Sequence, residues 1–391
     1  MSRKYFLGLN ANGPKVYETL FSCASSKNLR DFNELLAGKY QGAPMLTKNG
    51  RSALTIALKS YFEPGDKIIV NGFTCYAVYE AVVKAGMTPI FADISEKDLN
   101  FNITTLEKLW TGPAAASSPT ETGVSAGVPQ AASPVHTPRG IIIQNSLGNM
   151  VDMEVMEKFA KKHNLVLIED LAHSAGMEYP DGRETGTVGA ATVLSFGKDK
   201  SINTITGGAV ILRTPVKHKV KAPFKAPQIS EVLRARFYPL FCAVCRGLSY
   251  VHLGGVLMRF LILTHQVEKS ADSKLDLTRQ PPKFVAKLAM RQIKNFHHGK
   301  QPKLREFYLV KNRDEVLLKL RGAGYYFDSF WYEKPVSPVR YYKEVQFPEK
   351  DCPEAVRITE QIINFPTYYK KQDLKKAHEI VKPYLIGGEN D

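Results

Sequence analysis

Cysteine is scarce in this chain of 391 residues, and the five cysteines form no regular framework. They stand at positions 23, 75, 242, 245 and 352, an odd number without repeated spacing. Such usage is typical of a reducing compartment. The first residues, MSRKYFLGLNANG, also lack the apolar run of a secretory signal peptide. We therefore expect a cytoplasmic protein.

Long uncharged apolar runs are missing too. The most apolar segment, residues 215–275, contains interspersed arginines, and its longest stretch without a formal charge, 247–258, has 12 residues. A transmembrane helix needs about 20, so none is expected. The pair Cys242 and Cys245 has CxxC spacing but no second pair to complete a zinc site. We read both as packing residues of a helix and expect no metal.

Acidic residues are rare in one block of the chain. Between Arg213 and Arg305 there are 19 lysines and arginines against four acids, which accounts for the whole net charge of +15. A localised basic block indicates an anionic partner at one place. The aromatic and basic interleaving of nucleic-acid modules is missing, so nucleic acid is not the expected partner.

Helices and strands alternate regularly over residues 49–214. The strands are KIIVNG, TPIFADI, GIIIQN, LVLIED, ATVLSF and GGAVILR, with amphipathic segments such as SALTIALKSYF between the earlier ones. This order predicts an α/β domain with a largely parallel sheet covered by helices on both faces. Residues 1–48 predict an entry segment with a helix over 27–37.

Three further segments complete the domain organisation. Residues 111–140 are rich in proline and small residues and have only two charged side chains, which predicts a disordered loop inserted into the sheet domain. We expect residues 215–275 to form a basic, apolar helical segment with helices over 238–251 and 254–263. We expect residues 276–391 to form a smaller C-terminal α/β domain.

Two neighbouring features carry candidate chemistry. Asp170 ends the strand LVLIED, and ligands of open α/β sheets bind beyond the carboxyl ends of strands; a turn or helix-cap role is the alternative. The strand ending at Ser195 is followed by Lys198 and Lys200. A lysine amine becomes a nucleophile when burial or a second cation lowers its pKa. These residues alone leave open which lysine reacts, or whether both are solvated.

The order of these motifs resembles the DegT/DnrJ/StrS sugar aminotransferases, a fold-type-I pyridoxal-phosphate family. The matching blocks are Asp-Leu-Ala-His (170–173), Ser-Phe-x-x-x-Lys (195–200), Gly-Gly (207–208), NGRSAL (49–54), EPGDKIIVNGFTCYA (63–77), GMTPIFADI (86–94), LGNMVDMEVMEKFAKKHNLVLIEDLAHSAG (147–176) and TEQIINFPT (359–367). The resemblance covers roughly 40–210 and 280–391. It implies a mixed, mostly parallel sheet with helices on both faces.

The resemblance also assigns roles. Lys200, five residues after Ser195, matches the lysine that binds pyridoxal 5'-phosphate, whereas a histidine there would imply dehydration chemistry. Asp170 matches the partner of the pyridinium nitrogen, a carboxylate that makes the ring an electron sink. His173 matches a residue beside the ring, with a packed helix-start histidine as the alternative. The phosphate is expected where Gly50, Arg51 and Ser52 begin a helix, with the Ser195 hydroxyl added.

At two positions the sequence departs from the family pattern. Relatives usually have an aromatic residue stacked on the cofactor where Cys75 stands, and Phe73 or Tyr76 are the candidate substitutes. Relatives often have histidine where Asn145 stands, on the substrate side. These two positions leave the contacts with the cofactor ring and with the substrate open.

The resemblance implies transfer of an amino group from an amino acid, glutamate in most relatives, to a nucleotide-linked keto-sugar in polysaccharide biosynthesis. Relatives act as homodimers. The alternative is a non-catalytic descendant that acts as a binding or membrane-associated scaffold in glycan assembly. Relatives also lack residues 215–275, so this segment looks inserted. It is expected either to lie on anionic lipid at the inner face of the membrane or to cover the core or a subunit contact.

Overall fold

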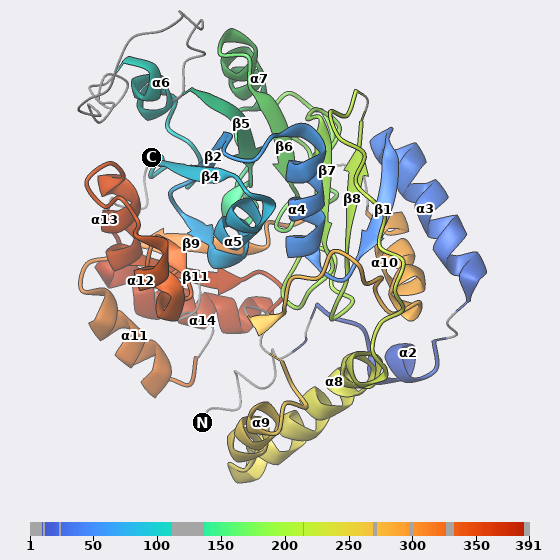
Figure 1. Ribbon diagram of the computed structural model, residues 1–391. Coiled ribbons are helices and arrows are strands. Elements are labelled where there is room, and N and C mark those ends of the chain that lie inside the picture. Colours follow the sequence, from blue (N-terminus) through green and yellow to red (C-terminus); the bar gives the residue numbers. More distant parts are fainter. Residues whose placement is uncertain are drawn as a thin grey trace, which may run out of the picture.

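The computed structural model describes residues 10–386, apart from residues 11, 23–24, 112–136, 214, 269–271, 297–300 and 326–331. Its centre is a seven-stranded sheet in the order β1-β8-β7-β6-β5-β2-β4 (Figure 1). β8 runs antiparallel to both of its neighbours, and the other pairs are parallel. The strands are β1 (Ala43–Thr47), β2 (Lys67–Asn71), β4 (Thr88–Ala92), β5 (Pro138–Ile143), β6 (Val166–Asp170), β7 (Ala191–Ser195) and β8 (Gly208–Leu212). The mixed, mostly parallel sheet is confirmed.

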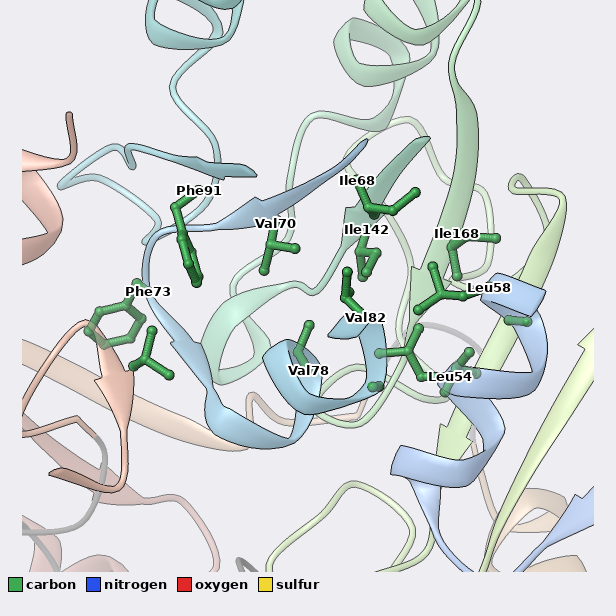
Figure 2. Close-up of a cluster of buried hydrophobic side chains, with 14 of the residues drawn as sticks. Leu54, Leu58, Ile68, Val70, Phe73, Val78, Val82, Phe91, Ile142 and Ile168 are labelled. Atoms are coloured by element: carbon green, nitrogen blue, oxygen red, sulfur yellow. The ribbon is translucent and has the colours of Figure 1, made fainter. Parts of the chain in front are cut away.

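Helices cover both faces of this sheet because successive strand residues point to opposite sides. On one face, Ile68, Val70, Ile142 and Ile168 pack with residues of α4 (Gly50–Tyr61) and α5 (Tyr76–Ala85) (Figure 2). The residues between them face α6 (Ile103–Thr111) and α7 (Met153–Lys162) at one end of the sheet. At the other end they face α3 (Ser26–Tyr40) and α10 (Phe284–Lys294).

The boundaries of the predicted loop 111–140 were wrong at both ends. Thr111 is the last residue of α6, and Pro138 to Gly140 already belong to β5. The physical reason is pairing, since Pro138 lies opposite Lys67 and Gly140 opposite Ile68 of β2. The remainder of the predicted loop, 112–136, lies outside the described residues.

The C-terminal part forms a smaller α/β unit. Its strands β9 (Arg305–Leu309) and β11 (Ile362–Pro366) pair antiparallel and carry α11 (Arg313–Gly322), α13 (Pro353–Gln361) and α14 (Lys371–Val381). The short β10 (Val336–Ser337) pairs with β3 (Thr74–Cys75), and α12 (Tyr342–Val345) follows it. The predicted start at residue 276 was too early, because α10 buries its apolar side in the same cluster as α3.

The segment 215–275 contains two helices, as predicted, but the first begins earlier. α8 spans Ile229–Leu248 rather than starting at residue 238, and α9 spans Gly254–Leu263. Gln228 and Glu231 form a capping box that starts α8, a signal that the apolar run alone did not reveal. A single 3₁₀ turn, η3 (Ser249–Val251), follows α8. Within the described residues, neither of these helices nor any other is long and apolar enough to cross a membrane.

Candidate active site

The carboxyl ends of β6 and β7 and the first turns of α4 and α5 meet around one cavity. Thirteen residues line it: Gly50, Arg51, Leu54, Cys75, Ala77, Val78, Gln144, Asp170, Ala172, His173, Ser195, Lys200 and Tyr332. Seven of them are residues that the sequence singled out. The parallel sheet brings them together because its strand ends share one edge.

Glycines hold the start of α4 tightly against the end of β7. A Cβ atom on Gly50 would lie 2.6 Å from the Cβ of Ser195, and one on Gly208 would lie 2.6 Å from the carbonyl carbon of Asn49. The Asn49 side chain caps the helix by accepting from the Ser52 N–H at 2.9 Å. The positive end of the α4 dipole therefore points to the Ser195 side of the cavity, where an anion is stabilised.

Lys200 and His173 face each other, with 3.2 Å between Nζ and Nε2. The Leu147 N–H donates to Nδ1 of His173 at 3.2 Å, so the neutral imidazole carries its proton on Nε2. Burial, with the charges of Lys200 and Arg305, holds the pKa of His173 well below its usual value. The imidazole beside the Lys200 amine is therefore neutral.

The neighbouring Lys198 points the opposite way. Its amine donates to the Glu268 carbonyl at 2.5 Å and lies 4.1 Å from the centre of the Tyr238 ring. Both partners belong to the inserted segment. Burial lowers the pKa of Lys198 to about 8. Of the two lysines, Lys200 lines the cavity and Lys198 does not.

Asp170 supplies a buried carboxylate at the floor of the cavity. Its Oδ1 accepts from the Ala172 N–H at 3.0 Å. Burial raises the pKa of Asp170, and the Ala172 N–H and the Lys200 charge counteract part of this increase. A cationic N–H donor in the cavity would offset the remaining desolvation and keep the carboxylate ionised.

Ser52, Tyr76 and Asn145, which the sequence also singled out, do not line the cavity. Ser52 is buried, and its hydroxyl accepts from the Asp276 N–H at 3.1 Å. Tyr76 stacks on Tyr341 with 4.1 Å between ring centres. Asn145 is buried outside the cavity, where its side chain donates to the Ser174 hydroxyl and accepts from the Val151 N–H.

Two lining residues that sequence reasoning missed are Gln144 and Tyr332. Gln144 accepts from the Thr74 hydroxyl at 2.8 Å. Tyr332 is buried in contact with Phe73, 4.3 Å between ring centres, and burial raises the pKa of its phenol well above the usual value. It comes from the C-terminal unit, and no local pattern marks it. The aromatic ring beside Cys75 is thus Tyr332, whereas Phe73 packs behind it and Tyr76 turns away.

These residues fit pyridoxal phosphate. The glycine cradle at the start of α4 suits a phosphate, the Lys200 amine suits an aldehyde carbon, and the buried Asp170 suits a protonated ring nitrogen. No group of three or more histidine, cysteine or acidic side chains in the described part of the chain could hold a metal ion.

Comparison with known proteins yields a family model and individual relatives. The model of the DegT/DnrJ/EryC1/StrS aminotransferase family matches residues 22–238. The chain is 32% identical over 165 residues to the pleiotropic regulatory protein of Geobacillus stearothermophilus, across 42% of this chain and 38% of that protein. It is 31% identical over 163 residues to the GDP-perosamine synthase of Caulobacter vibrioides, across 41% of this chain and 37% of the synthase. The chain thus matches less than half the length of either relative.

Among solved structures, a DegT DnrJ EryC1 StrS aminotransferase from Brucella abortus has the same fold. The TM-score is 0.63 at 17% identity, and the match covers 92% of this chain and 90% of the other. At this identity the likeness establishes the fold alone. It extends over both the sheet domain and the C-terminal unit.

Proposed function

The chain belongs to the DegT/DnrJ/EryC1/StrS aminotransferase family, and we propose that it is a pyridoxal-phosphate-dependent transaminase acting on a nucleotide-linked keto-sugar. The amino group would come from an amino acid, with glutamate as the expected donor. One observation carries the proposal: Lys200 faces His173 inside a cavity floored by Asp170. The name of the Caulobacter relative, GDP-perosamine synthase, supports a nucleotide-linked sugar.

Each residue of the cavity has a task in this reaction. When bound, pyridoxal phosphate supplies an electron sink for the carbanion formed next to the transferred nitrogen. Lys200 would hold the cofactor covalently, and its amine would move the proton at the reacting carbon. His173 keeps its proton on Nε2 and directs it at the Lys200 amine. Asp170 would hold the ring nitrogen protonated.

The remaining residues position the cofactor. The start of α4 at Gly50 and the Ser195 hydroxyl would hold the phosphate. Ala172 and Cys75 lie along the cavity wall, and Tyr332 would supply the aromatic surface. We further propose a cytoplasmic homodimer that works in polysaccharide biosynthesis, which the name of a Bacillus subtilis relative, spore coat polysaccharide biosynthesis protein SpsC, supports.

A second candidate is a non-catalytic descendant that binds or scaffolds. The name of the Geobacillus relative, pleiotropic regulatory protein, favours it. The cavity argues against it, because a scaffold has no need for a lysine beside a neutral histidine and a buried carboxylate.

The test is the absorbance spectrum of purified protein mixed with pyridoxal phosphate. The spectrum is recorded for wild type, for Lys200→Ala, and for Lys198→Ala as the matched control. We expect wild type and Lys198→Ala to show the absorbance of the lysine-bound cofactor and Lys200→Ala to lose it. A wild-type protein that leaves the spectrum of added cofactor unchanged would support the scaffold instead. Transfer from glutamate to a panel of nucleotide-linked keto-sugars then identifies the acceptor.

A further inference from the structure

The helices α8 and α9, with the turn between them, form a hairpin over residues 229–263 that projects from the body of the molecule beside α2 (Figure 1). Many of its large apolar side chains are exposed, in addition to the apolar side chains that it buries against the protein. We call this segment the α8–α9 hairpin. Its outer surface has no role in the cavity described above.

On α8 the exposed apolar residues lie along one face. Ile229, Leu233, Phe237 and Val244 are exposed, Ile229 to 79%, and their spacings of four, four and seven residues place them on the same side of a helix. The buried residues Ala235, Tyr238, Cys242 and Cys245 occupy the opposite side. The helix is therefore apolar both toward the protein and away from it.

The same pattern continues through the turn into α9. Tyr250, Val251 and Leu253 are exposed in the turn, and Val256, Phe260 and Leu263 follow at spacings of four and three residues, Leu263 to 78%. The inner side is closed, since a Cβ on Gly254 would lie 2.2 Å from the Cys245 carbonyl oxygen. Contiguous exposed apolar surfaces of this kind mark a binding surface.

The hairpin is held to the body independently of this outer surface. Arg236 donates to the backbone carbonyls of Thr19, Leu20 and Ser22 at 2.7–3.0 Å. Arg234 donates to the His265 carbonyl at 3.2 Å. The exposed apolar residues are thus additional to those that fix the hairpin in place.

The hairpin itself carries mainly basic charge. Glu231 is the only acid in residues 229–263, and of the four arginines there Arg236 is directed at the body, whereas Arg259 is exposed. Glu231 is paired with Lys48, with 2.6 Å between oxygen and nitrogen. The preceding segment, 217–225, contains four lysines and no acid, of which Lys217 is paired with Glu63. A partner of this surface must accept apolar side chains and carry negative charge.

We propose that the outer faces of the α8–α9 hairpin lie in the headgroup region of an anionic lipid bilayer, with the apolar side chains inserted and the basic residues at the phosphates. Amphipathic helices with arginines and lysines bind in this way without crossing the membrane. A second copy of the chain fits less well, because both faces would bring basic residues and the single acid of the hairpin, Glu231, is already paired with Lys48.

The test is flotation of the full chain with vesicles of phosphatidylcholine, with and without phosphatidylglycerol. We expect binding to the anionic vesicles, weakened by salt because these exposed charges are screened. Val256→Ser combined with Phe260→Ser should lower the partition coefficient roughly tenfold or more, because two exposed apolar side chains no longer insert into the bilayer. Arg259→Gln should lower it roughly fivefold. Leu318→Ser, an equally exposed apolar residue on α11, is the matched control and should bind like wild type.

Three outcomes would overturn the proposal. The first is no flotation of wild type with anionic vesicles. The second is a double variant that binds as well as Leu318→Ser. The third is a wild-type dimer in light scattering that the double variant splits while vesicle binding stays unchanged, which would assign the surface to a second copy. All the substituted residues are exposed, so thermal unfolding should match wild type and exclude misfolding as a cause.

Discussion

Lys198 and Lys200 are separated by one residue, yet their surroundings give them opposite tasks. Lys200 lines the cavity beside His173, whereas Lys198 lies against Tyr238 and the Glu268 carbonyl. The sequence alone could not separate them, because the direction of each side chain depends on the backbone of the loop. Only the family resemblance chose Lys200, and in the structure Lys200 is the one of the two that lines the cavity.

Lys198 makes the stability of the protein depend on pH in a predictable direction. Its pKa in the folded state is about 8, against about 10.4 in an unfolded chain. Between these values the unfolded state holds the proton and the folded state does not, so the free energy of unfolding rises with pH. Lys198→Met should remove this rise, which is at most about 3 kcal/mol for a shift of this size and smaller because water still reaches part of the side chain.

Urea unfolding of both proteins between about pH 8 and about pH 10 measures the effect. The difference in unfolding free energy, wild type minus variant, should increase across that window. Parallel curves for the two proteins would show that Lys198 keeps an ordinary pKa.

At the scale of elements, the sequence predicted the strands of the sheet well and the long insertion less well. Strands such as LVLIED are short apolar runs bounded by turns, and β6 ends at Asp170 as expected. The start of α8 was missed because it depends on a polar capping box and on contacts with α2, and not on a regular spacing of apolar residues. The place of α10 was missed for a similar reason, since its partner α3 lies some 250 residues earlier.

Arg236 is the main link between α8 and α2 (Val16–Leu20). It donates to three backbone carbonyls and lies 4.8 Å from the centre of the Phe284 ring. Hydrogen bonds from a charged donor contribute about 1.5–3 kcal/mol, so Arg236→Met should cost roughly that much. Amide hydrogen exchange should accelerate in residues 16–22 and not in the central sheet. Arg259→Met, on the exposed side of α9, is the control, and equal acceleration in both variants would contradict the prediction.

At the scale of the whole molecule, the cavity is completed by two parts of the chain that the sequence could not place relative to each other. The residues at the strand ends come from the sheet domain, and each of their motifs lies within one short stretch of the sequence. Tyr332 comes from the C-terminal unit, whose β10 pairs with β3 directly beside Cys75. Contacts between distant segments depend on packing of the finished fold, and no spacing in a single sequence encodes them.

Asp93 joins these two parts. It follows β4, is 2% exposed, and its carboxylate accepts from the N–H groups of Glu354 and Ala355 at 3.0 and 2.9 Å. It thereby caps α13, a helix with no capping side chain of its own. Asp93→Ala removes a helix cap and leaves buried N–H groups without an acceptor, so we expect a loss of about 2–4 kcal/mol in unfolding free energy.

A second contact at the same junction provides the comparison. Glu96 pairs with Arg357 of α13, but its side chain is 53% exposed, and exposed ion pairs contribute about 1 kcal/mol or less. Glu96→Ala should therefore shift the urea midpoint little, whereas Asp93→Ala should shift it strongly and accelerate amide exchange at the start of α13. Equal shifts for the two variants would mean that the junction is held by surface charge, and not by the buried carboxylate.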